Sequence, residues 1–241
     1  KKITIPIKNI PIELTKIRMA LISDLHVSTM ITNEYVQKVS NILKDMNPDI
    51  LFFTGDAADG SVDSYGSYMD PLSEINPKYG KYFVTGNHEY YSDLNGWLRI
   101  ITNLGFKILI NESQNITING KTLMITGIPD RSGKYFSEYH KTDMNKAIKG
   151  MQNSDISILL AHQPKDIEHA LKYNYHLQLS GHTHGGQYFP FSILVQLANP
   201  YLKGLHKKEN TWIYINQGTG YWGPPMRIGT EPEITEISFS T

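Results

Sequence analysis

Short apolar runs alternate along this chain with segments of helical periodicity, and each run stops at a polar cluster. Residues 33–46 carry apolar side chains at helical spacing, and Asn47-Pro48 ends that pattern. Short apolar runs bounded by glycine or polar residues are typical of buried β-strands. The alternation therefore predicts an α/β fold. The predicted buried strands cover residues 18–23, 50–54, 81–85, 155–160 and 175–180.

Weaker patterns predict the remaining elements. Residues 3–12 alternate apolar and polar side chains around Pro6 and Pro11, which suits an edge strand. Asn119-Gly120 separates two alternating segments and indicates a β-hairpin made of residues 112–118 and 121–127. The other expected elements are helices at 68–75, 95–104, 137–151 and 167–171 and a strand at 107–110.

The polar residues that follow the five buried strands are of types that bind metals. In α/β folds, functional sites lie beyond the carboxyl ends of the strands. A single such residue is usually part of a capped turn, but random placement would scatter these residues along the elements. If the strands lie side by side, their ends converge in one crevice. The converging set is Asp24, His26, Asp56, Asn87, His88, His162, His182 and His184.

The last two of these residues belong to the stretch Gly181-His182-Thr183-His184-Gly185-Gly186-Gln187. On a strand, two imidazoles at this spacing would point to opposite faces. On a tight turn, which the flanking glycines allow, both can face one cavity. A His-x-His pair is a common source of nitrogen ligands for metal, but alone it more often represents two surface histidines in a loop. The polar ends of the upstream strands are what favour a metal site here.

Composition narrows the chemistry. The 241 residues suit one domain, or one domain with an appended hairpin. Lys+Arg and Asp+Glu are both 23, which argues against non-specific nucleic-acid binding. Cysteine is absent, so a metal must be held by His, Asp, Glu or Asn. The absence of cysteine is compatible with a location on either side of a membrane. The mixed set suits two metals and favours Mn²⁺, Fe, Zn²⁺ or Ni²⁺ over Mg²⁺ or Ca²⁺.

The chain contains the motifs Asp24-x-His26, Gly55-Asp56-x-x-Asp59, Gly86-Asn87-His88-Glu89, His162 and Gly181-His182-x-His184. As a set, these motifs resemble the calcineurin-like metallophosphoesterase family. The resemblance covers about residues 18–187, and the motifs occur in the family's order with no ligand missing. Residues 216–227, together with Gly185-Gly186-Gln187, resemble a narrower bacterial branch. That branch contains YkuE- and YaeI-like phosphodiesterases and relatives that cleave UDP-2,3-diacylglucosamine.

The resemblance implies a four-layer αββα sandwich of two mixed sheets, with residues 211–215 and 233–239 as strands of the second sheet. It also implies a dinuclear centre with Mn²⁺ as the expected metal and a metal-bound hydroxide as the nucleophile. One metal would bind Asp24, His26 and His184, the other would bind Asn87, His162 and His182, and Asp56 would bridge them. His88 is expected to protonate the leaving oxygen or bind the phosphoryl group. Asp59 is expected to orient His88 or a ligand histidine, with a helix N-cap as the alternative.

The substrate is suggested by residues 189–208. Residues 189–197 are markedly apolar, and Lys203, Lys207 and Lys208 follow. The segment is either an ordinary core helix or an apolar flap beside the metals that contacts lipid. The flap reading predicts a lipid-linked or nucleotide-linked phosphodiester or pyrophosphate, such as UDP-2,3-diacylglucosamine, and peripheral membrane contact. Arg131 and Arg227 are either phosphate contacts or solvated loop arginines.

Two other functions remain as alternatives. One is a phosphomonoesterase or protein phosphatase, and the other is a non-catalytic metal-binding scaffold. No stretch of about 18 apolar residues is present that would span a bilayer. The bacterial branch often carries an N-terminal anchor or export signal, which would lie outside these 241 residues. We therefore expect one metallophosphoesterase domain over residues 1–241, with an apolar flap at 189–208 and association with a membrane.

Overall fold

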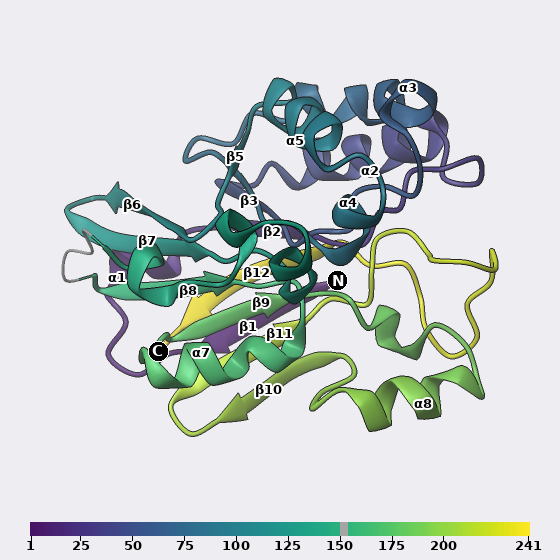
Figure 1. Cartoon of the computed structure of the whole chain (residues 1–241). Coiled ribbons are helices and arrows are strands. Elements are labelled where there is room, and N and C mark those ends of the chain that lie inside the picture. Colours follow the sequence, from purple (N-terminus) through teal and green to yellow (C-terminus); the bar gives the residue numbers. More distant parts are fainter. Residues whose placement is uncertain (150–153) are drawn as a thin grey trace.

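The computed structural model contains two six-stranded sheets packed face to face, with helices on both outer faces (Figure 1). It describes residues 1–149 and 154–241. The fold is the expected α/β sandwich of two mixed sheets with flanking helices.

The first sheet has the strand order β1-β12-β2-β3-β4-β5. Strands β2 to β5 run parallel, β12 is antiparallel to β2, and β1 is parallel to β12. The strands are β1 (Lys2–Pro6), β12 (Thr235–Ser240), β2 (Met19–Ile22), β3 (Ile50–Phe53), β4 (Lys81–Phe83) and β5 (Phe106–Ile108).

The second sheet has the strand order β10-β11-β9-β8-β7-β6. Its four central strands run parallel, and an antiparallel strand closes each edge. The strands are β10 (Gly204–Lys208), β11 (Thr211–Ile215), β9 (Leu177–Ser180), β8 (Ile156–Leu160), β7 (Lys121–Gly127) and β6 (Glu112–Ile118).

Helices form the outer layers. The α-helices are α1 (Ile12–Thr15), α2 (Asn33–Met46), α3 (Val62–Tyr65), α4 (Asn87–Tyr91), α5 (Leu94–Asn103), α6 (Met144–Ala147), α7 (Ile167–Lys172) and α8 (Phe191–Ala198). The 3-10 helices are η1 (Gly66–Glu74), η2 (Arg131–Tyr135), η3 (Glu138–His140), η4 (Pro164–Asp166) and η5 (His184–Gly186). In Figure 1, α2, α3 and α5 cover the outer face of the first sheet, and α7 covers that of the second.

Three buried apolar clusters follow from this layering. The cluster between the sheets joins side chains such as Leu21 and Phe52 of the first sheet to Ile158 and Leu179 of the second. An outer cluster packs the opposite face of the first sheet against α2 and α5. The third cluster packs the second sheet against α6 and α7. Because both faces of the central strands are covered, these strands read in the sequence as continuous apolar runs.

Most of the predicted elements are present, with three local differences. The edge strand ends at Pro6, and Ile12 begins a short helix instead. The helix expected at 68–75 is 3-10 helix η1, which contains Pro71 and therefore lacks one backbone N–H donor. The prediction of one helix over residues 137–151 was wrong for the described part, which contains the short helices η3 and α6. Its residues 150 and 151 lie outside the described residues.

The last strand was assigned to the wrong sheet. Residues 211–215 join the second sheet as β11, as expected, but β12 lies in the first sheet between β1 and β2. The reason is the course of the connecting loop. The backbone N–H groups of Thr219 and Gly220 donate to the carbonyls of Ser23 and Asp24, so the chain crosses to the first sheet before β12 begins.

Candidate metal centre

Both sheets end at the same edge of the sandwich, and the predicted site residues meet there. Asp24 and His26 follow β2, Asp56 follows β3, and His162 follows β8. Asn87 and His88 open helix α4 after β4, and His182 and His184 follow β9. The five strands therefore lie in two facing sheets, not in one sheet, yet their carboxyl ends converge.

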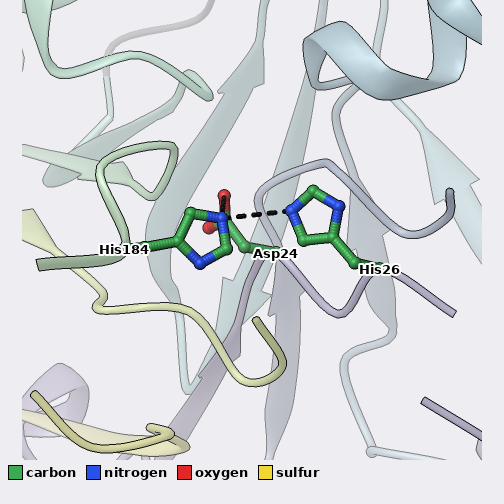
Figure 2. A group of neighbouring side chains, drawn as sticks. All are labelled: Asp24, His26 and His184. Atoms are coloured by element: carbon green, nitrogen blue, oxygen red, sulfur yellow. Dashed lines mark hydrogen bonds and ion pairs between the residues drawn. The ribbon is translucent and has the colours of Figure 1, made fainter. Parts of the chain in front are cut away.

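The first group consists of Asp24, His26 and His184, whose ligand atoms all lie within 4.8 Å of one another. Figure 2 shows the two imidazoles and the carboxylate pointing toward one another. The Nε2 atoms of His26 and His184 are 3.1 Å apart, and His184 Nε2 lies 3.4 Å from Asp24 Oδ1. All three side chains are buried.

The second group consists of Asp56, His162 and His182, again with ligand atoms within 4.8 Å of one another. His162 Nε2 lies 3.1 Å from Asp56 Oδ2 and 3.2 Å from His182 Nδ1. The other ring nitrogen of His162 donates to the Thr54 carbonyl at 2.7 Å. Because Nδ1 carries that proton, the Nε2 lone pair of a neutral His162 is directed at the Asp56 carboxylate.

Asp56 lies between the two groups. Its Oδ2 is 3.1 Å from His162 Nε2 and 3.7 Å from His26 Nε2. Its Oδ1 accepts the backbone N–H of His88 at 2.8 Å. One carboxylate oxygen therefore faces imidazoles of both groups.

The donor set fits divalent cations. Close contacts between lone pairs of imidazoles and carboxylates need a proton or a cation between them. The buried Oδ1 of Asn87 has no hydrogen-bond partner among the described residues, although buried polar atoms rarely lack one. Carboxylate, amide and imidazole donors are the ligands that Mn²⁺, Fe, Zn²⁺ and Ni²⁺ accept.

The backbone at this edge is strained. Asp24, His26, Asp56, His182 and His184 all have positive φ values, between 50° and 71°. Each such non-glycine residue costs of order 1–3 kcal/mol, and clusters of them occur at functional sites. The left-handed conformation lets both histidines of the His-x-His turn face the cavity, as expected.

Two glycines allow the loops to approach closely. Gly55 has φ of +90°, and a Cβ atom there would lie 2.4 Å from the backbone nitrogen of Gly86. A Cβ atom on Gly86 would lie 2.1 Å from Asp56 Oδ1. Glycine at both positions therefore lets the Asp56 loop and the start of helix α4 approach each other closely.

The protonation states of the second group are linked. Burial would raise the pKa of Asp56, but His162, His26 and His88 lower it well below its usual value. Burial would lower the pKa of His162, but Asp56 and Asp24 raise it well above its usual value. Burial and His162 lower the pKa of His182 to about 4. The carboxylates of Asp56 and Asp24 thus favour a positive charge at the position of His162.

Asp59 contacts two histidines. Its Oδ1 pairs with Nδ1 of His88 and lies 3.2 Å from Nδ1 of His26. Burial would lower the pKa of His88, but the Asp59 hydrogen bond and the charge of Asp56 raise it to about 9. Asp59 does not cap a helix, because the N-cap residue of α3 is Ser61.

Glu89 has a structural role that the sequence did not predict. Its buried carboxylate accepts backbone N–H bonds from Asp56, Ala57 and Gly86 at 3.1, 2.6 and 2.6 Å. Burial and the charge of Asp56 raise its pKa to about 7. The bond from the Gly86 N–H to Glu89 is one half of a capping box, but glycine has no side chain to supply the other half, so the sequence lacked the full Ser/Thr-x-x-Glu signal.

The two arginines are held by the protein itself. Arg131 Nε pairs with buried Asp166 at 2.7 Å. Arg227 donates to backbone carbonyls of Gln217, Gly218 and Gly220 and to that of His184. Neither arginine lines the cavity beside the metal-ligand candidates, so the structure gives no support to a phosphate contact by either.

A cavity of about 530 Å³ opens beside these residues. Asp56, Asn87, His88, His182 and His184 line one end of it. The rest of the lining is mostly apolar and includes Phe191, Leu194, Val195 and Ala198 of α8 and Trp222; we call this part the apolar end of the cavity. A ligand in this cavity would contact metal-binding side chains and apolar side chains at once.

The chain belongs to the calcineurin-like phosphoesterase family, whose profile matches residues 17–186. A zebrafish (Danio rerio) protein named transmembrane protein with metallophosphoesterase domain is 36% identical over 98% of this chain and 56% of its own length. The uncharacterized metallophosphoesterase YkuE of Bacillus subtilis is 30% identical over 91% of this chain and 77% of its own length.

Solved structures agree with this fold. The NAD nucleotidase NadN of Haemophilus influenzae superposes with a TM-score of 0.54 at 16% identity, over 84% of this chain and 50% of that one. The chain spans about half the length of the first relatives that it matches. Among the described residues, no helix has the length and apolar character needed to cross a membrane.

Proposed function

We propose that this protein is a metal-dependent phosphoesterase that hydrolyses a phosphodiester or pyrophosphate bond at a dinuclear metal centre. The position of Asp56 carries this proposal, because its Oδ2 faces His26 of one ligand group and His162 of the other. The proposed ligands are Asp24, His26 and His184 for one ion and Asn87, His162 and His182 for the other, with Asp56 shared.

Two divalent cations, with Mn²⁺ expected and Zn²⁺, Fe or Ni²⁺ as alternatives, would supply a hydroxide nucleophile at neutral pH and neutralise the phosphate. The chain itself would hold the two cations through these side chains and transfer a proton. His88 lines the cavity, and Asp59 engages its Nδ1. That contact leaves Nε2 of His88 for the leaving oxygen, so we assign His88 as the proton donor and Asp59 as the residue that orients it.

The proposed substrate is a lipid-linked or nucleotide-linked phosphoester, of which UDP-2,3-diacylglucosamine is an example. The apolar end of the cavity beside the metal ligands supports a substrate with an apolar part. We further propose that residues 1–241 form one domain. Strands β1 and β12 come from the two ends of the chain and pair in the first sheet, which supports this division.

Membrane contact is part of the proposal. No residue of α8 is buried, which argues against an ordinary core helix and supports an apolar flap. The expected bounds of that flap, 189–208, also include edge strand β10. The segment carries Lys203, Lys207 and Lys208 and no acidic residue, which suits anionic headgroups. The word transmembrane in the names of two relatives is consistent with this location.

Flotation with anionic liposomes tests the contact with Ile193→Ser and Leu197→Ser combined, since both side chains are exposed. We expect the wild-type protein to float and the double variant to stay in solution. Equal flotation of the two proteins, with both folded, would remove membrane contact through α8 from the proposal.

The catalytic proposal is tested with bis(p-nitrophenyl) phosphate and p-nitrophenyl phosphate. The protein is stripped of metal, reloaded with Mn²⁺ and compared with Asp56→Ala. We expect metal-dependent cleavage of the diester that is lost in the variant. Turnover of the monoester alone would identify a phosphomonoesterase, and cleavage of neither compound by metal-loaded protein would favour a binding role.

A further inference from the structure

The apolar end of the cavity has the character of a site for a hydrocarbon chain. Phe191, Leu194, Val195 and Ala198 follow one another at helical spacing, so one face of α8 forms the wall. Trp222 lines the same cavity, and its ring lies 6.4 Å from that of Phe191. The same indole lies 6.3 Å from the ring of His88, so the wall begins beside the proposed proton donor.

The polar side chains in this wall are engaged by the protein. The side-chain amide of Gln187 donates to the Trp222 carbonyl at 2.6 Å and accepts the Trp222 N–H at 2.9 Å. Thr183 Oγ1 donates to the Leu202 carbonyl at 2.6 Å. Asn199 donates its amide to the Val195 carbonyl at 3.0 Å. These contacts turn much of the wall's hydrogen-bonding capacity away from a ligand.

This wall discriminates between the two substrate classes named above. The titratable groups that line the cavity are Asp56, His182 and His184 of the proposed ligands, His88 beside them, and Tyr91, whose ring lies 5.7 Å from that of His88. A nucleoside at the apolar end would leave most polar atoms of its base and sugar unpaired, and each unpaired buried polar group is costly. A hydrocarbon chain has no such groups and gains from burial against Leu194 and Trp222.

We propose that this cavity binds the hydrocarbon chain of a lipid phosphoester, with the phosphate at the metal ligands and the chain between α8 and Trp222. The proposal rests on the phosphoesterase function proposed above and selects the lipid class over the nucleotide class. Leu194 and Trp222 are then residues that determine specificity. Leu194 is 62% exposed although it lines the cavity, so a bound chain would complete its burial.

The test uses soluble p-nitrophenyl phosphodiesters whose second ester group is methyl, butyl or octyl, each below its micelle concentration. We expect kcat/KM to rise about two- to fourfold for each methylene that enters the cavity. The p-nitrophenyl ester of thymidine 5′-phosphate should be hydrolysed no faster than the methyl ester. A flat series, or a preference for the thymidine ester, would overturn the proposal.

Two variants of α8 locate the effect. Leu194→Asp puts a charge on the cavity wall and should flatten the chain-length series, so that the octyl ester loses its advantage over the methyl ester. Ile193→Asp adds the same charge on the same helix at a residue that is half exposed and does not line the cavity, so the series should persist. Loss of the series in both variants, or in neither, would contradict this placement of the chain.

A binding measurement separates this inference from the catalytic proposal. Titration calorimetry of methyl-, butyl- and octylphosphonate into Mn²⁺-loaded protein does not depend on turnover. If no ester is hydrolysed but affinity rises with chain length, the catalytic proposal fails and the chain site stands. If affinity is independent of chain length, the chain site fails, whatever the hydrolysis results.

Discussion

Substituting Gly55 by alanine tests whether the close approach of two loops positions Asp56. Positive φ in an alanine costs about 1–2 kcal/mol. The added Cβ would lie 2.4 Å from the Gly86 nitrogen, whereas ordinary contact begins at 3.4 Å, so one loop has to move by about 1 Å. Overpacking of this kind costs about 1–3 kcal/mol. We therefore expect Gly55→Ala to lower the free energy of unfolding by about 2–5 kcal/mol.

The matched control is Gly120→Ala in the hairpin between β6 and β7. Gly120 also has positive φ, +80°, but a Cβ there meets nothing within 4 Å. This variant carries the strain without the contact, so we expect a loss of about 1–2 kcal/mol and unchanged activity. In Gly55→Ala, a displacement of the Asp56 carboxylate by about 1 Å should lower kcat/KM by about 100-fold.

Urea unfolding of both variants in the presence of chelator measures stability without metal linkage. Hydrolysis of bis(p-nitrophenyl) phosphate at saturating Mn²⁺ measures the site. If the two variants lose equal stability and Gly55→Ala keeps wild-type activity, the approach of the Gly55 and Gly86 backbones does not position Asp56.

Three further predictions follow from the site. His88→Asn should slow the hydrolysis of esters with alkyl leaving groups about 100-fold and that of p-nitrophenyl esters much less, since p-nitrophenolate leaves without a proton. Equal slowing of hydrolysis across a leaving-group series would argue against His88 as the acid. Mn²⁺ at about 100 times its Kd should raise the thermal midpoint of metal-stripped protein by roughly 5–10 °C, and an unchanged midpoint in a melting experiment would contradict a metal site. Arg131→Ala should lower stability at pH 8 by about 1–3 kcal/mol, below the range for a fully buried pair because Arg131 is 36% exposed. Burial raises the folded-state pKa of Asp166 to about 6, so its carboxyl is protonated below that pH, and denaturation at pH 5 should show a smaller loss; an equal loss at both pH values would refute this reasoning.

The sequence alone predicted the buried central strands and the identity of the proposed ligands, but it did not predict edge strand β10. Buried strands such as β2 and β3 are apolar on both faces, so each reads as an unbroken apolar run with a sharp polar end. Because functional residues collect at those ends, the order of Asp, Asn and His along the chain marked one site before any contact was known. The His-x-His turn was foreseeable from the glycines that flank it, although the histidines themselves also adopt the left-handed backbone.

Tertiary structure decided which strands are neighbours and what surrounds the ligands. Thr235–Ser240 reads as a strand in either sheet, and only the backbone contacts of Thr219 and Gly220 place it in the first. Residues 191–198 read equally as a core helix, but no side chain of α8 is buried, because the helix lies beside a cavity and not beneath a sheet. Ala57, which donates to Glu89, and His184, whose carbonyl accepts from Arg227, come from distant segments of the chain. Local periodicity records whether a residue is buried, but it carries no information about which distant residue buries it.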